Sequence, residues 1–179
     1  MGSVWIAGSY QSDFARNYAR EGLEISDMVA ESVAGTLDRQ GQPYVFPHVR
    51  HVVTDAFRRA GIGDVSGVDG IETHDCFSMS EYMAIDHFGI TEPGESWKAV
   101  ENGELERDGA IPVNPSGGLI GVGHPVGATG VRMLHDAARQ VTGQAGDCQV
   151  DGARTFATLN IGGSLTTAVS FVVAGPEKG

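Results

Sequence analysis

The sequence has little positive charge, few cysteines and no long apolar run. Its 179 residues carry 12 Lys and Arg against 23 Asp and Glu, for a formal net charge of −11. A chain this acidic is expected to repel nucleic acid and anionic membrane surfaces, so neither is an expected partner. No apolar run approaches the roughly 20 residues of a membrane span, and the N-terminus lacks the basic and apolar blocks of a secretory signal.

The two cysteines, Cys76 and Cys148, lie in settings too different to indicate a disulfide framework. So few cysteines favour a reducing compartment, and we expect the cytoplasm. No CxxC pair, HExxH or phosphate loop is present, and His48 and His51, three residues apart, are typical of a helix surface rather than a metal site. We therefore expect no metal.

The composition, 41% hydrophobic and 20% charged, is that of a soluble globular protein with one substantial core. Apolar spacing and turn residues predict a strand at 3–9, a loop at 10–24 and a helix from 25 that ends near Gly41. A second helix follows from Pro47 to Ala60 with Gly61 as its stop.

Beyond this point the pattern predicts a strand at 68–73, a helix at 78–88 and an acidic, solvated excursion at 91–110. The chain closes with β-rich runs at 154–160 and 165–174, joined by a turn at 161–164 as in antiparallel strands. The predicted fold is α/β, with a mixed sheet of at most five strands and helices on its faces.

A glycine-rich stretch at 114–130 contains His124 as its single ionisable side chain. Such a stretch favours a tight loop or close approach of a ligand, although plain connections also have this composition. From Gly127 apolar residues recur at helical spacing, at Val131, Leu134, Ala138 and Val141. His124 is therefore expected just before a helix N-terminus, where a negatively charged oxygen binds well.

The segment His74-Asp75-Cys76-Phe77 follows the predicted strand at 68–73 and precedes a helix in which Ser78 and Glu81 have capping-box spacing. At a strand-to-helix turn the helix dipole favours the thiolate of Cys76, which makes it a competent acid or base. The alternative is a buried, inert thiol.

These two motifs resemble the thiolase superfamily, and in particular its sterol-carrier-protein-type branch. Most thiolases carry Asn-Glu-Ala-Phe at the turn and their acid/base cysteine in a late Cys-x-Gly-Gly-Gly run. That branch has His-Asp-Cys-Phe and lacks the late cysteine, and this sequence reads Asn-Ile-Gly-Gly-Ser at 160–164. The paired departure is what identifies the branch.

The resemblance implies that each half of a thiolase subunit repeats one α/β unit. Residues 1–41 then look like the start of the first half, and residues 44–175 like most of the second, with 40–43 as the seam. The family's nucleophilic cysteine and its coenzyme A loops belong to the stretch between these parts and have no counterpart here. Cys148 sits in an acidic turn unlike the family's nucleophile turn, and we interpret it as an incidental thiol.

The resemblance also implies site roles. Cys76 matches the thiol that moves a proton at the substrate's α-carbon, His124 matches a donor to the thioester oxygen, and His74 matches the residue that holds a water as the second donor. The backbone N–H of Gly162 matches part of an oxyanion hole for the acylated cysteine. A coenzyme A thioester is the implied substrate, with no tightly bound cofactor, although the acidity argues mildly against an unaided coenzyme A site.

Three hypotheses follow: a thiolase-type acyltransferase of lipid metabolism, a catalytically inactive remnant or interaction subunit, and a thiolase-like carbon–carbon lyase. Without the nucleophile, the chain alone is predicted to be inactive or nearly so in thiolysis. Incompletely covered apolar surface predicts a dimer or association with another thiolase-like subunit.

Overall fold

A computed structural model describes residues 45–163 and 165–176. The strand at 3–9, the loop at 10–24, the helix that ends near Gly41 and the seam at 40–43 lie outside the described residues. The described helices and strands are α2 (Pro47–Arg59), β1 (Gly70–Thr73), α3 (Ser78–Phe88), α4 (Ser96–Glu101), α5 (Gly118–Val122), α6 (Thr129–Val141), β2 (Thr155–Gly162) and β3 (Thr167–Ala174), with 3-10 turns η2 (Val65–Gly67) and η3 (Gly146–Cys148).

The three strands form one mixed sheet in the order β1-β2-β3. β1 runs parallel to β2, with Thr73 opposite Leu159, and β2 runs antiparallel to β3. A single parallel bridge joins Ile71 to Val113 outside the strands. The mixed sheet agrees with the sequence-based prediction, and the carboxyl ends of β1 and β2 lie at the same end of the sheet.

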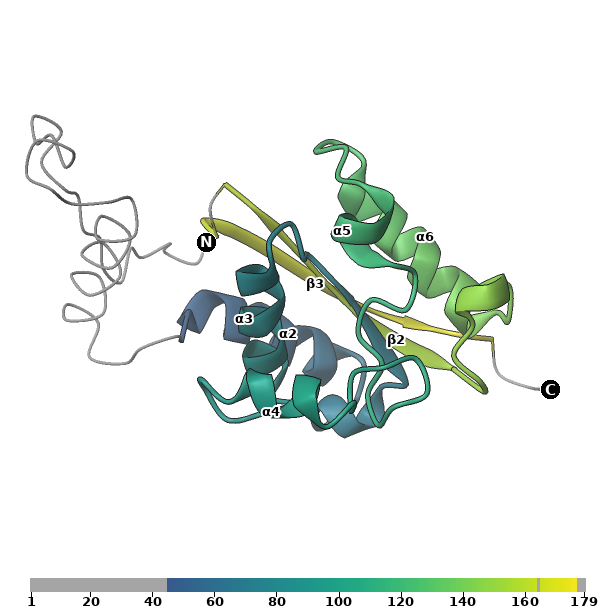
Figure 1. The fold of residues 1–179 in the computed structure, drawn as a ribbon, viewed down its shortest axis with the longest axis horizontal. Coiled ribbons are helices and arrows are strands. Elements are labelled where there is room, and N and C mark those ends of the chain that lie inside the picture. The colour runs from purple at the N-terminus through teal and green to yellow at the C-terminus, as the bar shows by residue number, and fades with distance from the viewer. Residues whose placement is uncertain (1–44, 164, 177–179) are drawn as a thin grey trace, which may run out of the picture. The chain divides into compact units, whose positions relative to one another are not determined.

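Helices cover both faces of this sheet (Figure 1): α2, α3 and α4 lie on one side, α5 and α6 on the other. The alternation of side chains along β2 explains the two layers, since neighbouring residues point to opposite faces. Ala157 and Leu159 join the core under α2 and α3, whereas Phe156 joins the core under α6. Each helix layer therefore buries its own set of strand residues.

The same alternation determines which residues of β1 point toward α6. A Cβ at Gly70 would lie 2.3 Å from the ring of Phe156, so Gly70 points into the α6 layer. Glu72 and His74, at steps of two residues, share that face, and Ile71 points to the other core. Polar side chains of β1 thus face the layer that contains the glycine-rich stretch.

The bounds of α3 agree with the predicted helix at 78–88, but its predicted capping box does not form. Phe77 is the N-cap and makes no side-chain capping bond, which makes Ser78 the first helical residue. Glu81 instead accepts a hydrogen bond from the Asn114 amide at 3.3 Å. A long-range partner has replaced the local one that the sequence suggested.

The glycine-rich stretch corrects one prediction and confirms another. Residues 118–122 form the short helix α5 where only a loop was expected. The helix predicted after Gly127 is α6, and of its predicted apolar positions Val141 is buried, whereas Val131 is 72% exposed. The buried face of α6 also includes Thr129, Met133 and Ala137.

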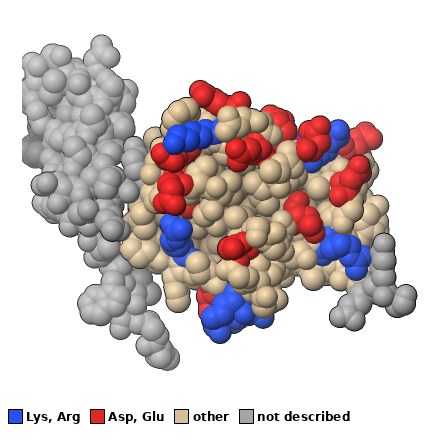
Figure 2. All heavy atoms as spheres, turned by 90° about the horizontal axis from the view of Figure 1, so that it is seen from below, with Lys and Arg blue, Asp and Glu red and all other residues tan. Residues whose placement is uncertain are grey.

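The acidic excursion is largely exposed, as expected, and contains the short helix α4. Acidic and basic side chains are interspersed on the face in Figure 2, which presents no broad basic surface. Within residues 45–163 and 165–176, no helix has the length and apolar character needed to cross a membrane.

Candidate active site

The glycine-rich stretch is attached to the end of β1 by Asn114. Its backbone N–H donates to the Ile71 carbonyl at 2.8 Å, and its side-chain oxygen accepts the Thr73 N–H at 2.7 Å. Asn114 adopts a φ of 51°, a left-handed conformation that asparagine tolerates better than most residues. This residue turns the chain from the sheet edge toward α5.

Two buried carboxylates of the β1 end hold the next part of the stretch. Glu72 accepts hydrogen bonds from the Ser116 hydroxyl at 2.7 Å and from the Ser116 N–H at 3.3 Å. Asp75 accepts the Leu119 N–H at 2.6 Å and lies 3.5 Å from the Ile120 nitrogen, in the first turn of α5. Asp75 therefore caps α5 from another part of the chain, since helix N-termini leave such donors unsatisfied.

Glu72 is fully buried, and its pKa is raised to about 7, chiefly because burial disfavours the charged form. The two hydrogen bonds from Ser116 oppose the shift, and Asp136 adds to it. Sequence reasoning missed this residue. Its position in the sequence could have revealed it, because a side chain two residues before His74 in a strand points to the same face of the sheet as His74.

The structure brings His74 and His124 together from separate segments. Their rings meet edge to face, with centroids 4.8 Å apart and an interplanar angle of 86°. His74, 7% exposed, directly follows β1, and its Nδ1 lies 2.7 Å from the Asn160 side-chain oxygen on β2. His124 lies in the exposed loop before α6, and its Nδ1 lies 2.7 Å from the Thr129 hydroxyl. Each ring is held through Nδ1.

Asn160 was not recognised as a site residue from the sequence. Its amide nitrogen points toward the start of α6, where a Cβ at Gly130 would lie 2.8 Å from it. The lack of a side chain at Gly130 therefore leaves room for the Asn160 amide beside His74. Register reveals this arrangement, because Thr73 and Leu159 are partners and the next residues on both strands lie side by side.

Cys76 lies in the turn between β1 and α3, as expected. Its thiol is half-buried, and the sulfur lies 3.6 Å from the Ser80 hydroxyl. Gly162 is the final residue of β2, opposite Thr167, rather than part of the turn itself. Cys76 and Gly162 thus occupy the carboxyl ends of two adjacent parallel strands, as His74 does.

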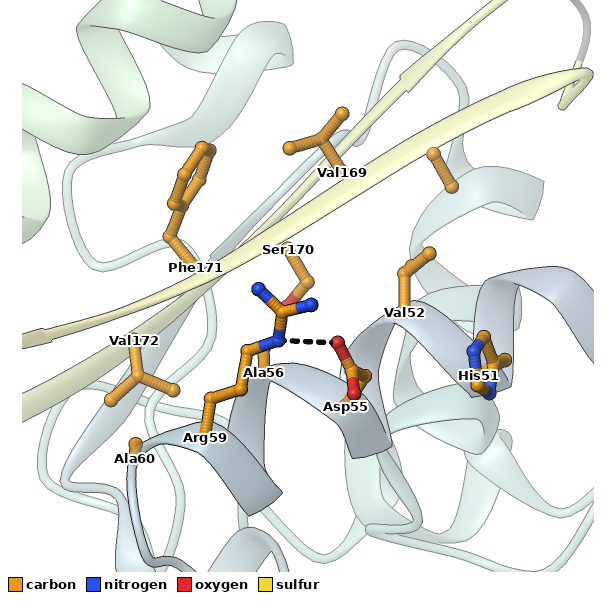
Figure 3. A pocket seen from close by; sticks show the side chains of 11 residues that line it. His51, Val52, Asp55, Ala56, Arg59, Ala60, Val169, Ser170, Phe171 and Val172 are labelled. Atoms are coloured by element: carbon orange, nitrogen blue, oxygen red, sulfur yellow. Dashed lines mark ion pairs between the residues drawn. The ribbon is translucent and has the colours of Figure 1, made fainter. Parts of the chain in front are cut away.

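Cys148 is a free, half-buried thiol in η3. It lines a small cavity of about 160 Å³ with Ser116 and Arg132, and neither His74 nor His124 lines that cavity. A larger groove of about 520 Å³ lies between α2 and β3 (Figure 3), with the Arg59–Asp55 ion pair over an apolar floor. Neither hollow is lined by His74 or His124.

The arrangement provides imidazoles and a thiol at one end of the sheet. Such groups can donate hydrogen bonds to a developing oxyanion and transfer a proton. Across the described ranges, no group of three or more His, Cys, Asp or Glu side chains is placed to hold a metal ion.

A family model described as "Thiolase C-terminal domain-like" matches residues 30–175. The chain belongs to this thiolase family. The resemblance inferred from the turn and the glycine-rich stretch is confirmed. The family match begins at residue 30, within the segment 1–41 that we assigned to the start of a first half, and the division of the chain at 41–44 stays a prediction.

Curated relatives extend well beyond this thiolase chain. It is 38% identical over 162 residues to an acetyl-CoA acetyltransferase of Methanothermobacter thermautotrophicus, covering 88% of this chain and 41% of the relative. It is 37% identical over 122 residues to sterol carrier protein 2 of Rattus norvegicus, covering 68% of this chain and 22% of the relative. The chain thus spans less than half the length of these relatives.

A benzoylsuccinyl-CoA thiolase subunit of Thauera aromatica is 27% identical over 138 residues, covering 73% of this chain and 36% of that subunit. Among solved structures, a chain of the Ltp2-ChsH2(DUF35) aldolase matches with a TM-score of 0.63 and 20% identity, covering 72% of this chain and 32% of that one. This structural match supports the thiolase-like α/β fold.

Proposed function

We propose that this chain supplies the acid–base and carbonyl-polarising groups of a thiolase-type acyltransferase site. The substrate would be an acyl-coenzyme A thioester, and the reaction would cleave or form the carbon–carbon bond of a 3-oxoacyl-coenzyme A in lipid metabolism. Cys76 is the proposed proton carrier. His124 is the proposed direct donor to the thioester oxygen, and His74 the holder of a water that serves as the second donor.

The observation that carries this proposal is the edge-to-face pair of His74 and His124. Both Nδ1 atoms are engaged by protein side chains, and among residues 45–163 and 165–176 no hydrogen bond reaches Nε2 of either ring, which supports its use for a substrate or water. A thioester oxygen becomes negatively charged when the α-carbon loses its proton, and pre-positioned donors stabilise that charge. Two imidazoles held close together fit that requirement.

The proton transfer that we assign to Cys76 is a simple exchange. The thiolate takes the proton from the α-carbon, and the C–H electron pair moves into the enolate. The enolate oxygen accepts hydrogen bonds from His124 and from the water held by His74. Reversal returns the proton from the thiol to carbon. Cys76 lies at the turn before α3 and is only half-buried, which supports its role as an accessible thiol.

No acyl-accepting nucleophile is assigned. Cys148 is the one other thiol among the residues described, and neither histidine lines the cavity beside it. Gly162 is proposed as part of an oxyanion hole for an acylated cysteine that another part of a complete enzyme would supply. We therefore expect little or no thiolysis by the isolated chain.

Association with a second copy or another thiolase-like subunit is part of the proposal. The chain covers 41% of its acetyltransferase relative, and several large apolar side chains of the α5–α6 region are exposed. These are Ile120, Val122, Val126 and Val131.

Two free cysteines support the proposed cytoplasmic location.

A carbon–carbon lyase is the second candidate. Such a reaction needs proton transfer and carbonyl polarisation but no acyl-enzyme, and the described residues hold the first set of groups without a recognised nucleophile. An inactive interaction subunit is the third outcome, and it predicts no turnover of any thioester.

Incubation with radiolabelled acetyl-coenzyme A tests whether the chain contains an acyl-accepting nucleophile. The intact chain, Cys76→Ala and Cys148→Ala would be denatured after incubation and assayed for covalent label. We expect no stoichiometric acyl-protein in any of them. Stoichiometric labelling that disappears only in Cys148→Ala would show that Cys148 is a nucleophile and would overturn the assignment.

A further inference from the structure

The two histidines of the site are held by different chemical groups. Asn160 presents an amide oxygen to His74, whereas Thr129 presents a hydroxyl to His124. An amide oxygen can only accept a hydrogen bond, but a hydroxyl can also donate one. The partner on Nδ1 decides which ring nitrogen carries the proton in a neutral imidazole.

His74 must donate to Asn160. The Nδ1 atom lies 2.7 Å from Oδ1, an acceptor, so the proton of the neutral ring is on Nδ1. The amide nitrogen of Asn160 is directed elsewhere, toward Gly130 at the start of α6. Nε2 of His74 then has a free lone pair and accepts a hydrogen bond.

His124 is in the opposite situation because of Pro125. The Thr129 hydroxyl has one proton and two possible acceptors, His124 Nδ1 at 2.7 Å and the Pro125 carbonyl at 3.2 Å. That carbonyl already accepts the N–H groups of Ala128 at 2.8 Å and Thr129 at 3.1 Å, so it is a weaker acceptor for the hydroxyl than the nearer ring nitrogen. The hydroxyl proton therefore goes to the shorter contact, and the neutral His124 ring carries its proton on Nε2.

We propose that Asn160 and Thr129 are positioning residues that hold the two imidazoles in opposite neutral tautomers. His74 is an acceptor at Nε2, and His124 is a donor at Nε2. Thr129 is 1% exposed and has no freedom to turn its hydroxyl toward bulk water. The tautomer of His74 is assigned from an acceptor-only partner, and that of His124 from the competition between two acceptors for one hydroxyl proton. Their chemical meaning rests on the proposed function.

Opposite tautomers fit the proposed roles of the two rings. A donor at His124 Nε2 can bind the thioester oxygen directly. An acceptor at His74 Nε2 can take one proton of a water, which leaves the other water proton for the same oxygen. If both rings presented lone pairs, they would repel the developing negative charge.

The test is nitrogen-15 NMR of the full chain with labelled histidine, at a pH where the imidazoles are neutral. Long-range proton–nitrogen correlations separate protonated from unprotonated ring nitrogens. We expect one neutral tautomer for each ring, protonated at Nδ1 in His74 and at Nε2 in His124. A wild-type spectrum with His124 protonated at Nδ1, or with His74 protonated at Nε2, would overturn the inference without any variant.

Matched variants assign the cause. Thr129→Val removes the hydroxyl at similar volume and should convert the His124 signals from one tautomer to a mixture, whereas Thr129→Ser should restore the single form. Asn160→Leu should have the same effect on His74 alone. Unchanged tautomers in both Thr129→Val and Asn160→Leu would refute the positioning roles. The readout is independent of turnover, so the expected tautomers without thioester chemistry would refute the proposed function and leave this inference intact.

Discussion

The carboxylate of Asp75 accepts the backbone N–H of Leu119 at 2.6 Å, and both groups are buried. This bond joins the turn that contains Cys76 to the glycine-rich stretch that leads to His124. Hydrogen bonds to a charged acceptor contribute about 1.5–3 kcal/mol to stability. Removing one partner of such a bond is more costly in the interior than at the surface, because the other partner is left buried without a hydrogen bond. The relative position of the two motifs depends on it.

Gly118→Ala should separate these motifs. A Cβ at position 118 would lie 2.2 Å from an Asp75 carboxylate oxygen, and the φ of +59° is itself unfavourable for alanine. We expect a loss of about 3 kcal/mol in the free energy of unfolding, measured by urea denaturation. Gly121→Ala is the matched control, because a Cβ there meets no atom within 4 Å. Equal stability of the two variants would contradict the packing described.

Glu72 should make stability fall as the pH rises. Its folded-state pKa of about 7 lies above the ordinary value of 4.5, so the folded chain retains a proton that the unfolded chain releases. Its stabilising contribution is present below pH 4.5 and lost as the pH rises through 7. The full change is about 3 kcal/mol.

The corresponding experiment compares wild type with Glu72→Gln between these two pH values. The variant should lack this part of the pH dependence, and Glu92→Gln, at an exposed position, should retain it. Parallel curves for wild type and Glu72→Gln would mean that the carboxyl is not held in the protonated form by the fold.

His87 should act in the opposite direction. Burial lowers its pKa, and its neutral ring donates from Nδ1 to the Met83 carbonyl at 2.7 Å and accepts the Phe46 N–H at Nε2 at 2.8 Å. Its stabilising contribution is present above the ordinary histidine value of 6.5 and lost as the pH falls through the lowered folded-state pKa. Thermal unfolding at decreasing pH should show this loss in wild type and a smaller one in His87→Gln, whereas His135→Gln, at an exposed position, should behave as wild type.

The exposed apolar residues of the α5–α6 region should promote self-association. Val126 is 84% and Val131 is 72% exposed, and such residues favour burial against another surface. Sedimentation velocity at micromolar concentration should show dimers or larger species. The Val126→Glu/Val131→Glu double variant should shift the distribution to monomer, and Gln144→Glu should not. A stable, well-folded wild-type monomer would argue against this prediction.

Local patterns in the sequence predicted the main elements of the described region. Pro47 and Gly61 marked the two ends of α2, and the helix predicted at 78–88 is α3. What the sequence did not reveal depends on contacts between distant segments. Asp75 accepts a hydrogen bond from the first turn of α5, 44 residues away in the sequence. Glu81 accepts a hydrogen bond from Asn114 and does not form the capping box that the local sequence suggested.

The candidate site likewise contains residues that the sequence indicated and residues that only the structure revealed. Family motifs indicated His74, Cys76 and His124, because each lies in a recognisable short pattern. Asn160 and Thr129 lie within the quoted runs, but nothing in those runs marks them as partners of the histidines, and Glu72 lies in no motif. Only strand register and side-chain direction reveal these contacts. Residues that position a site are harder to infer than those that define its motif.

The central claim is that Cys76 and His124 activate the α-carbon of a thioester, and hydrogen–deuterium exchange at that carbon tests it most directly. The chain would be incubated in heavy water with acetyl-coenzyme A, and exchange would be followed by proton NMR. We expect exchange above the uncatalysed rate, reduced about 10²-fold or more in Cys76→Ala and in His124→Asn and unchanged in Cys148→Ala. Exchange at the uncatalysed rate in wild type, or exchange that persists in Cys76→Ala, would contradict the account.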